Sequence, residues 1–132
     1  RVLLDAAHNA LGAERLARFL AEVGSSYTLL FGALADKRGD AMLGTLAANA
    51  TKLVLTRPPS PRALDPAALV GVVAGPSIQV VEEPERALEA ALAAQSELVV
   101  ACGSIYLVGL LRKLLRERYG VPEAAAAVSV TG

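Results

Sequence analysis

The sequence has no tryptophan, only one histidine and one cysteine, and an aromatic content of 4%. The single cysteine, Cys102, excludes an intrachain disulfide and any metal site made of cysteines alone, and it favours a reducing, cytoplasmic compartment. The one histidine, His8, cannot form a metal site by itself. Because large aromatic side chains are scarce, the core must be packed from small and branched aliphatic side chains.

An excess of charge of one sign is also missing, since 13 Lys and Arg residues balance 13 Asp and Glu residues. A neutral chain has no overall field that attracts nucleic acid or an anionic membrane surface, so we expect neither as a partner. The longest uncharged stretches, residues 67–81 and 98–111, are too short to cross a bilayer. Any ligand must therefore be held by local groups.

The hydrophobic content of 54% over 132 residues is enough to bury the core of one domain, and the length leaves little room for a second. Residues 1–5 already have the character of a strand, and the first of them is arginine instead of methionine. We therefore expect residues 1–132 to be a single soluble domain and a piece of a longer protein.

Apolar runs of strand length alternate along the chain with segments of helical periodicity. The predicted strands cover residues 1–5, 27–31, 52–56, 78–81 and 98–102. The predicted helices cover residues 11–23, 40–46, 65–70, 84–94 and 105–118, followed by a frayed helix at 124–127 and an edge strand at 128–130. This alternation predicts an α/β fold, with a mostly parallel sheet of about five to six strands and helices on both faces.

Polar side chains gather where the predicted strands end. They are Asp5, His8 and Asn9 after the first strand, Asp36, Lys37 and Arg38 after the second, Arg57 and Arg62 after the third, and Ser104 after the fifth. In open parallel sheets ligands bind at the carboxyl ends of the strands, where loops carry side chains and helix N-termini present amide groups. The sequence therefore predicts a binding site at this edge.

Each of these groups also has a structural interpretation. Asp5 and Ser104 are suited to cap the amides of a following loop or helix. His8 could serve as a hydrogen-bonding residue of its loop, and residues 36–38 could be a solvated turn. Arg62 could bind a neighbouring carbonyl.

Several familiar motifs do not occur, namely G-x-G-x-x-G, G-x-x-x-x-G-K-[ST], H-E-x-x-H and G-x-S-x-G. The chain therefore has no dinucleotide fingerprint and no phosphate loop of its own. Cys102 is expected to be a small buried residue at a strand end, because no second histidine is present to activate it. The polar residues at the carboxyl edge therefore form only part of a binding site, and the rest must come from elsewhere.

Four segments resemble the carboxy-terminal domain of folylpolyglutamate synthases. Residues 2–9 (VLLDAAHN) resemble its opening D-G-A-H-N-P motif and, more loosely, the D-x-A-H-N-P motif of Mur ligases. In the family's order, residues 31–37 (FGALADK) resemble F-G-A-L-x-D-K, residues 56–63 resemble a strand end followed by P-R-A, and residues 103–109 (GSIYLVG) resemble G-S-L-Y-L-V-G. Ala6 and Ala10 replace the family's glycine and proline, which predicts altered loop stiffness and unchanged chemistry.

The resemblance implies a Rossmann-like Mur ligase carboxy-terminal domain of an enzyme that joins glutamate to a folate through an acyl phosphate. It further implies ATP and Mg²⁺ as cofactors, both bound mainly by an amino-terminal domain, so we expect this chain alone to be inactive and to hold no metal. The residues that match the family's motifs are Asp5 for the nucleotide and His8 and Ser104 for glutamate, with Asn9, Asp36, Lys37 and Arg62 as supporting residues.

Two other functions stay open at this point. The first is a Mur-type cell-wall ligase domain that adds an amino acid to a nucleotide-linked peptide, although the P-R-A and G-S-x-Y-L segments favour the folate branch. The second is a non-catalytic module that binds a nucleotide or an amino acid. Whether a parent folate ligase also makes dihydrofolate depends on a pterin site elsewhere.

Overall fold

The structure is a computed structural model that describes residues 1–120 and 126–129. Its strands are β1 (Val2–Asp5), β2 (Tyr27–Phe31), β3 (Ala50–Leu55), β4 (Ser77–Val80), β5 (Leu98–Cys102) and β6 (Ala126–Ser129). Its α-helices are α1 (Ala10–Val23), α2 (Gly39–Leu46), α3 (Pro84–Ala93) and α4 (Ile105–Arg118). Two 3₁₀ helices, η1 (Ala47–Asn49) and η2 (Pro66–Leu69), precede β3 and β4.

The strands form one six-stranded sheet in the order β4-β3-β2-β5-β1-β6. Every pair of neighbouring strands in it is parallel. The chain first runs from β1 toward β4 on one side of β5 and then returns to β5 and β6. The order of the strands therefore reverses next to β5, which lies between β1 and β2.

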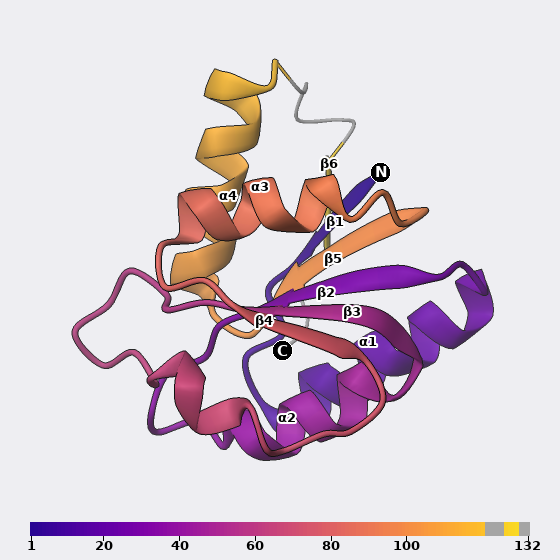
Figure 1. The fold of residues 1–132 in the computed structure, drawn as a ribbon, viewed down its shortest axis with the longest axis vertical. Coiled ribbons are helices and arrows are strands. Elements are labelled where there is room, and N and C mark those ends of the chain that lie inside the picture. Colours follow the sequence, from indigo (N-terminus) through magenta and orange to yellow (C-terminus); the bar gives the residue numbers. More distant parts are fainter. Residues whose placement is uncertain (121–125, 130–132) are drawn as a thin grey trace.

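Helices cover both faces of the sheet, as Figure 1 shows, with α1 and α2 on one face and α3 and α4 on the other. The alternation of side chains along the strands divides the core in the same way. In β2, Leu29 and Phe31 pack with α1 and α2, whereas Leu30 packs with α3 and α4. Both faces being covered explains why the inner strands are almost continuously apolar.

The predicted fold class is confirmed, and β2, β5 and α4 have the predicted bounds. Other strands shift slightly: β3 begins two residues and ends one residue before the predicted bounds, and β4 begins and ends one residue earlier than predicted. The helix predicted at 65–70 is the short 3₁₀ helix η2, capped by Asp65.

The expected frayed helix at 124–127 is wrong for residues 126 and 127, which belong to β6. Pairing with the open edge of β1 satisfies backbone groups in this segment, and it overrides the helix propensity of alanine. The edge strand itself is confirmed, although it begins two residues before the predicted position 128. Residues 124, 125 and 130 lie outside the described residues.

Gly32 and Gly103 allow the carboxyl ends of β2 and β5 to come close together at the predicted site. Gly103 has a φ of +109°, and a Cβ atom there would lie 2.5 Å from the Gly32 carbonyl oxygen. The Gly103 amide donates to the Ala7 carbonyl at 2.9 Å, and the Gly32 amide donates to the Cys102 carbonyl at 3.3 Å. The loops after β1, β2 and β5 are therefore joined directly by backbone contacts.

Replacing Gly103 with alanine is expected to lower the free energy of unfolding by about 2 kcal/mol or more, because the change adds both backbone strain and a steric overlap. Urea denaturation measures this change in the free energy of unfolding. The matched control is Gly109→Ala in α4, where no atom lies within 4 Å of the added Cβ. That control should be neutral or stabilising by about 0.5–1 kcal/mol, since alanine favours a helix. Equal stability of the two variants would contradict the close approach of Gly103 to the Gly32 carbonyl.

Candidate functional site

The loops that follow β1, β2, β3 and β5 meet at the carboxyl edge of the sheet. The helices after β1 and β5 leave toward opposite faces, so a crevice opens between these strand ends, as expected where the strand order reverses. A pocket of about 180 Å³ lies there. It is lined by His8, Leu34, Lys37, Arg62, Gly103, Ser104, Ile105 and Tyr106.

The pocket brings together four of the predicted site residues, His8, Lys37, Arg62 and Ser104, from four different loops. Its volume is below the range of about 300–1,000 Å³ that is usual for drug-sized ligands, so it suits a molecule of amino-acid size. None of the residues that line it is acidic. The pocket is therefore electropositive and suited to an anionic group.

His8 presents one defined ring nitrogen to a ligand. Its Nδ1 lies 2.9 Å from the Ala6 carbonyl oxygen, which can only accept a hydrogen bond. Nδ1 must therefore carry a proton, and in the neutral imidazole Nε2 is then an acceptor. The structural role expected of this histidine and a ligand-binding role are thus compatible, because they use different nitrogens.

Ser104 is the N-cap of α4, as its structural interpretation predicts. Its Oγ accepts hydrogen bonds from the amides of Tyr106 at 3.1 Å and Leu107 at 3.4 Å. These two helix amides are therefore not available to an anion, so fewer amides than expected can bind a ligand at the start of α4. The hydroxyl still has its own proton to donate, since both of these bonds use the oxygen as an acceptor.

The loops after β2 and β3 are tied to each other, and this places Lys37 and Arg62 at the pocket. Leu34 and Ala63 form an isolated antiparallel bridge, with the Ala35 amide donating to the Arg62 carbonyl at 2.8 Å. The Arg62 guanidinium lies 3.4 Å from Asp36, in an exposed ion pair. Among the residues that the structure describes, no acidic side chain pairs with Lys37.

Asp5 and Asn9 brace the loop after β1. Asp5 is 1% exposed, and its Oδ1 accepts a hydrogen bond from the Ala7 amide at 2.8 Å. Asn9 is the N-cap of α1 and accepts from the Gly12 amide at 2.8 Å. These contacts hold the loop that carries His8, and neither residue lines the pocket.

Cys102 is fully buried at the end of β5, as predicted. Burial, and then the nearby negative charge of Asp5, raise the pKa of its thiol far above the ordinary value. The thiol therefore stays protonated at neutral pH and is not a nucleophile.

The first 105 residues match the sequence profile of one family, described as "Mur ligase, glutamate ligase domain". The chain belongs to this family. A search of curated protein sequences gave no match.

Solved structures similar to this Mur ligase domain are folylpolyglutamate synthases. The enzyme from Thermotoga maritima is 33% identical with a TM-score of 0.72, over 85% of this chain and 27% of that one. The enzyme from Mycobacterium tuberculosis, complexed with ADP and AMPPCP, is 31% identical with a TM-score of 0.73, over 83% and 28%. The ligand-free bifunctional folylpolyglutamate synthase/dihydrofolate synthase from Yersinia pestis is 25% identical with a TM-score of 0.76, over 86% and 29%. The chain thus spans less than a third of the length of these relatives.

Two cations predicted at the same edge are not part of the pocket of this Mur ligase domain. Arg38 has a φ of +50° and pairs with Asp40 at the start of α2. Arg57 pairs with Glu82 and Asp65, away from the pocket lining. Within residues 1–120 and 126–129, no helix is long and apolar enough to cross a membrane, and no cluster of three or more metal-ligating side chains occurs.

Sequence reasoning missed Ile105 and Tyr106, which line the pocket from the first turn of α4. These two residues are 53% and 44% exposed, so neither belongs to the core. The signal was present, because both follow Ser104 directly in the G-S-I-Y segment at the carboxyl edge. Apolar residues inside an amphipathic helix are, however, normally assigned to the core.

Proposed function

We propose that this chain is the carboxy-terminal domain of an ATP-dependent ligase that joins L-glutamate to a folate by an amide bond, through an acyl phosphate. One observation carries the proposal: in a glutamate ligase domain, His8, Lys37, Arg62 and Ser104 converge on one electropositive pocket of amino-acid size. The similarity to folylpolyglutamate synthases at 31 and 33% identity supports a folate as the acceptor.

The groups in the pocket match the charges of L-glutamate, which has two carboxylates and one ammonium group. The Ser104 hydroxyl and the cations Lys37 and Arg62 would bind the carboxylates, because charged and oriented donors form the stronger hydrogen bonds. Nε2 of His8 would accept a hydrogen bond from the ammonium group. Asp36 would hold Arg62 in place from outside the pocket.

ATP and Mg²⁺ would be bound mainly by an amino-terminal domain of the same enzyme, which would supply the phosphate loop. The chain spans only 27–29% of its structural relatives, which supports such a second domain, and the M. tuberculosis relative binds ADP and AMPPCP. Asp5 would contact the nucleotide when the two domains close. Closure would also exclude water from an acyl phosphate that would otherwise hydrolyse.

The isolated 132-residue chain is expected to fold as a monomer under the reducing conditions of the cytoplasm. It is expected to show no ATP-dependent ligation of glutamate to a folate. The reason is that it has no phosphate loop. Phosphate release and product formation are measured against a control without protein. Folate-dependent phosphate release by this chain alone would contradict the proposal that a separate amino-terminal domain binds ATP.

The same chain tests the pocket directly. Adding L-glutamate to the isotopically labelled chain is expected to shift the NMR signals of His8, Ser104 and Tyr106, with a Kd on the order of 1 mM, since one domain supplies only part of the site. L-Leucine, which lacks the second carboxylate, is the control. Equal shifts with both amino acids, or shifts elsewhere only, would remove glutamate as the ligand of this pocket.

A further inference from the structure

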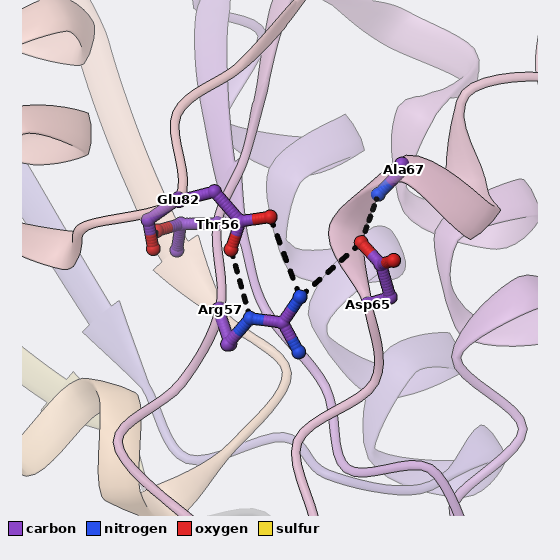
Figure 2. A network of polar contacts seen from close by, with 5 residues as sticks. All are labelled: Thr56, Arg57, Asp65, Ala67 and Glu82. Carbon is purple, nitrogen blue, oxygen red and sulfur yellow. Dashed lines mark hydrogen bonds and ion pairs between the residues drawn. The ribbon is translucent and has the colours of Figure 1, made fainter.

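Arg57 joins three separate segments at the carboxyl edge, and it does not line the pocket. Its Nε lies 2.8 Å from Oε2 of Glu82, and its Nη2 lies 3.3 Å from Oε1 of the same carboxylate. The same Nη2 lies 3.4 Å from Oδ1 of Asp65. Figure 2 shows the guanidinium between these two carboxylates. We call these contacts the Arg57 bridge.

Backbone contacts strengthen each end of the Arg57 bridge. The Arg57 amide donates to the Glu82 carbonyl at 3.2 Å, and the Thr56 hydroxyl donates to the same carbonyl at 3.1 Å. Asp65 Oδ1 also accepts from the Ala67 amide at 3.0 Å and so caps η2. One side chain thus connects the end of β3, the end of β4 and the start of η2.

The segment between the two ends of the bridge, residues 57–65, carries Arg62 to the pocket. Pro58, Pro59 and Pro61 have no amide hydrogen, and the amides of Ser60, Arg62 and Ala63 bond within the segment. These internal bonds do not join the segment to the rest of the domain. Its contacts with the loop after β2 come from the Arg62 carbonyl, the Leu64 amide and the exposed ion pair between Arg62 and Asp36. Its position therefore depends on those contacts and on the Arg57 bridge.

We propose that Arg57 is a positioning residue that holds residues 57–65 closed, and thereby places the Arg62 guanidinium where a carboxylate of the substrate binds. This proposal rests on the proposed function for its substrate. The closed position of residues 57–65 is a property of the chain alone and is independent of the proposed function. Isolated exposed ion pairs contribute little to stability, so a bridge of this kind acts on the local geometry more than on the fold.

Hydrogen exchange in the isolated chain tests the closed segment. Arg57→Ala is expected to speed exchange of the Ala35 and Leu64 amides, which bond between this segment and the loop after β2, about three- to tenfold while the melting temperature changes little. Arg57→Lys should restore part of the protection. Asp65→Asn should have a smaller effect, because asparagine still caps η2.

The matched control is Arg118→Ala, which removes another exposed Arg–Glu pair of 2.8 Å, between α4 and α3. It should leave the exchange of Ala35 and Leu64 unchanged. Unchanged exchange in Arg57→Ala, or equal acceleration in the Arg118→Ala control, would overturn the proposal.

Kinetics of the complete ligase test the positioning role. Arg57→Ala is expected to raise the KM for glutamate about threefold with kcat and the KM for ATP unchanged, and to add almost nothing in an Arg62→Ala background, because the two residues act as one unit. Full additivity would show that Arg57 does not act through Arg62. If Arg62→Ala alone leaves the KM for glutamate unchanged, the proposed use of Arg62 fails, and the exchange experiment still decides the closed segment.

Discussion

Replacing His8 with alanine in the complete ligase is expected to reduce kcat/KM for glutamate about tenfold or more, with a much smaller change in the KM for ATP. Loss of a hydrogen bond to a charged group costs about 1.5–3 kcal/mol, and the loss should fall on the substrate that the pocket binds. Ser104→Ala should act in the same direction. Steady-state kinetics with glutamate varied at saturating ATP measure both effects.

Ser104 requires a second variant, because its Oγ also caps α4. Ser104→Ala is expected to lower the free energy of unfolding by about 1 kcal/mol, whereas glycine at an N-cap costs only a few tenths of that. Ser104→Gly therefore removes the hydroxyl with little loss of helix stability. Normal glutamate kinetics in Ser104→Gly and in His8→Ala would leave both residues with structural roles only.

Asp5→Asn in the complete ligase is expected to raise the KM for ATP or to lower turnover severalfold, if Asp5 contacts the nucleotide on domain closure. The structure makes this a demanding prediction, because the carboxylate is 1% exposed and binds the Ala7 amide. Asparagine keeps an oxygen that can accept that amide hydrogen bond, so the free energy of unfolding of the isolated chain should change by about 1 kcal/mol at most.

Thermal unfolding of the isolated chain and ATP kinetics of the complete ligase separate the two roles of Asp5. Markedly lower stability together with normal ATP kinetics would assign Asp5 to the loop alone.

Most of the fold follows from the sequence, because periodicity and apolar runs report which segments are buried and on how many sides. The uninterrupted run at 27–31 belongs to the inner strand β2, whose residues are all buried. The tail was predicted only in part, because its edge strand is confirmed but residues 126 and 127 were expected to be helical. The segment 126–129 is rich in alanine, and only its pairing with β1 makes it a strand.

The site was predictable as far as local motifs reach. His8 and Ser104 could be placed at one edge because both directly follow predicted strands. The Arg57 bridge could not, because Arg57, Asp65 and Glu82 become neighbours only when β3 and β4 pair, and sequence does not state which strands are adjacent. The division of roles between the two nitrogens of His8 likewise depends on a carbonyl orientation that only the folded loop defines.

The position of β1 in the sheet has a consequence for how the chain acquires its structure during synthesis. Within the described residues β1 pairs only with β5 and β6, so the first of these six strands to be made has the last two as its partners. Pairings between segments far apart in the sequence form slowly, since a long loop must close before they contribute. The half-sheet β2-β3-β4 can assemble as the ribosome advances, whereas β1 stays without a neighbour until residues 98–102 emerge. The pocket, which needs the ends of both β1 and β5, is therefore among the last parts of this domain to form.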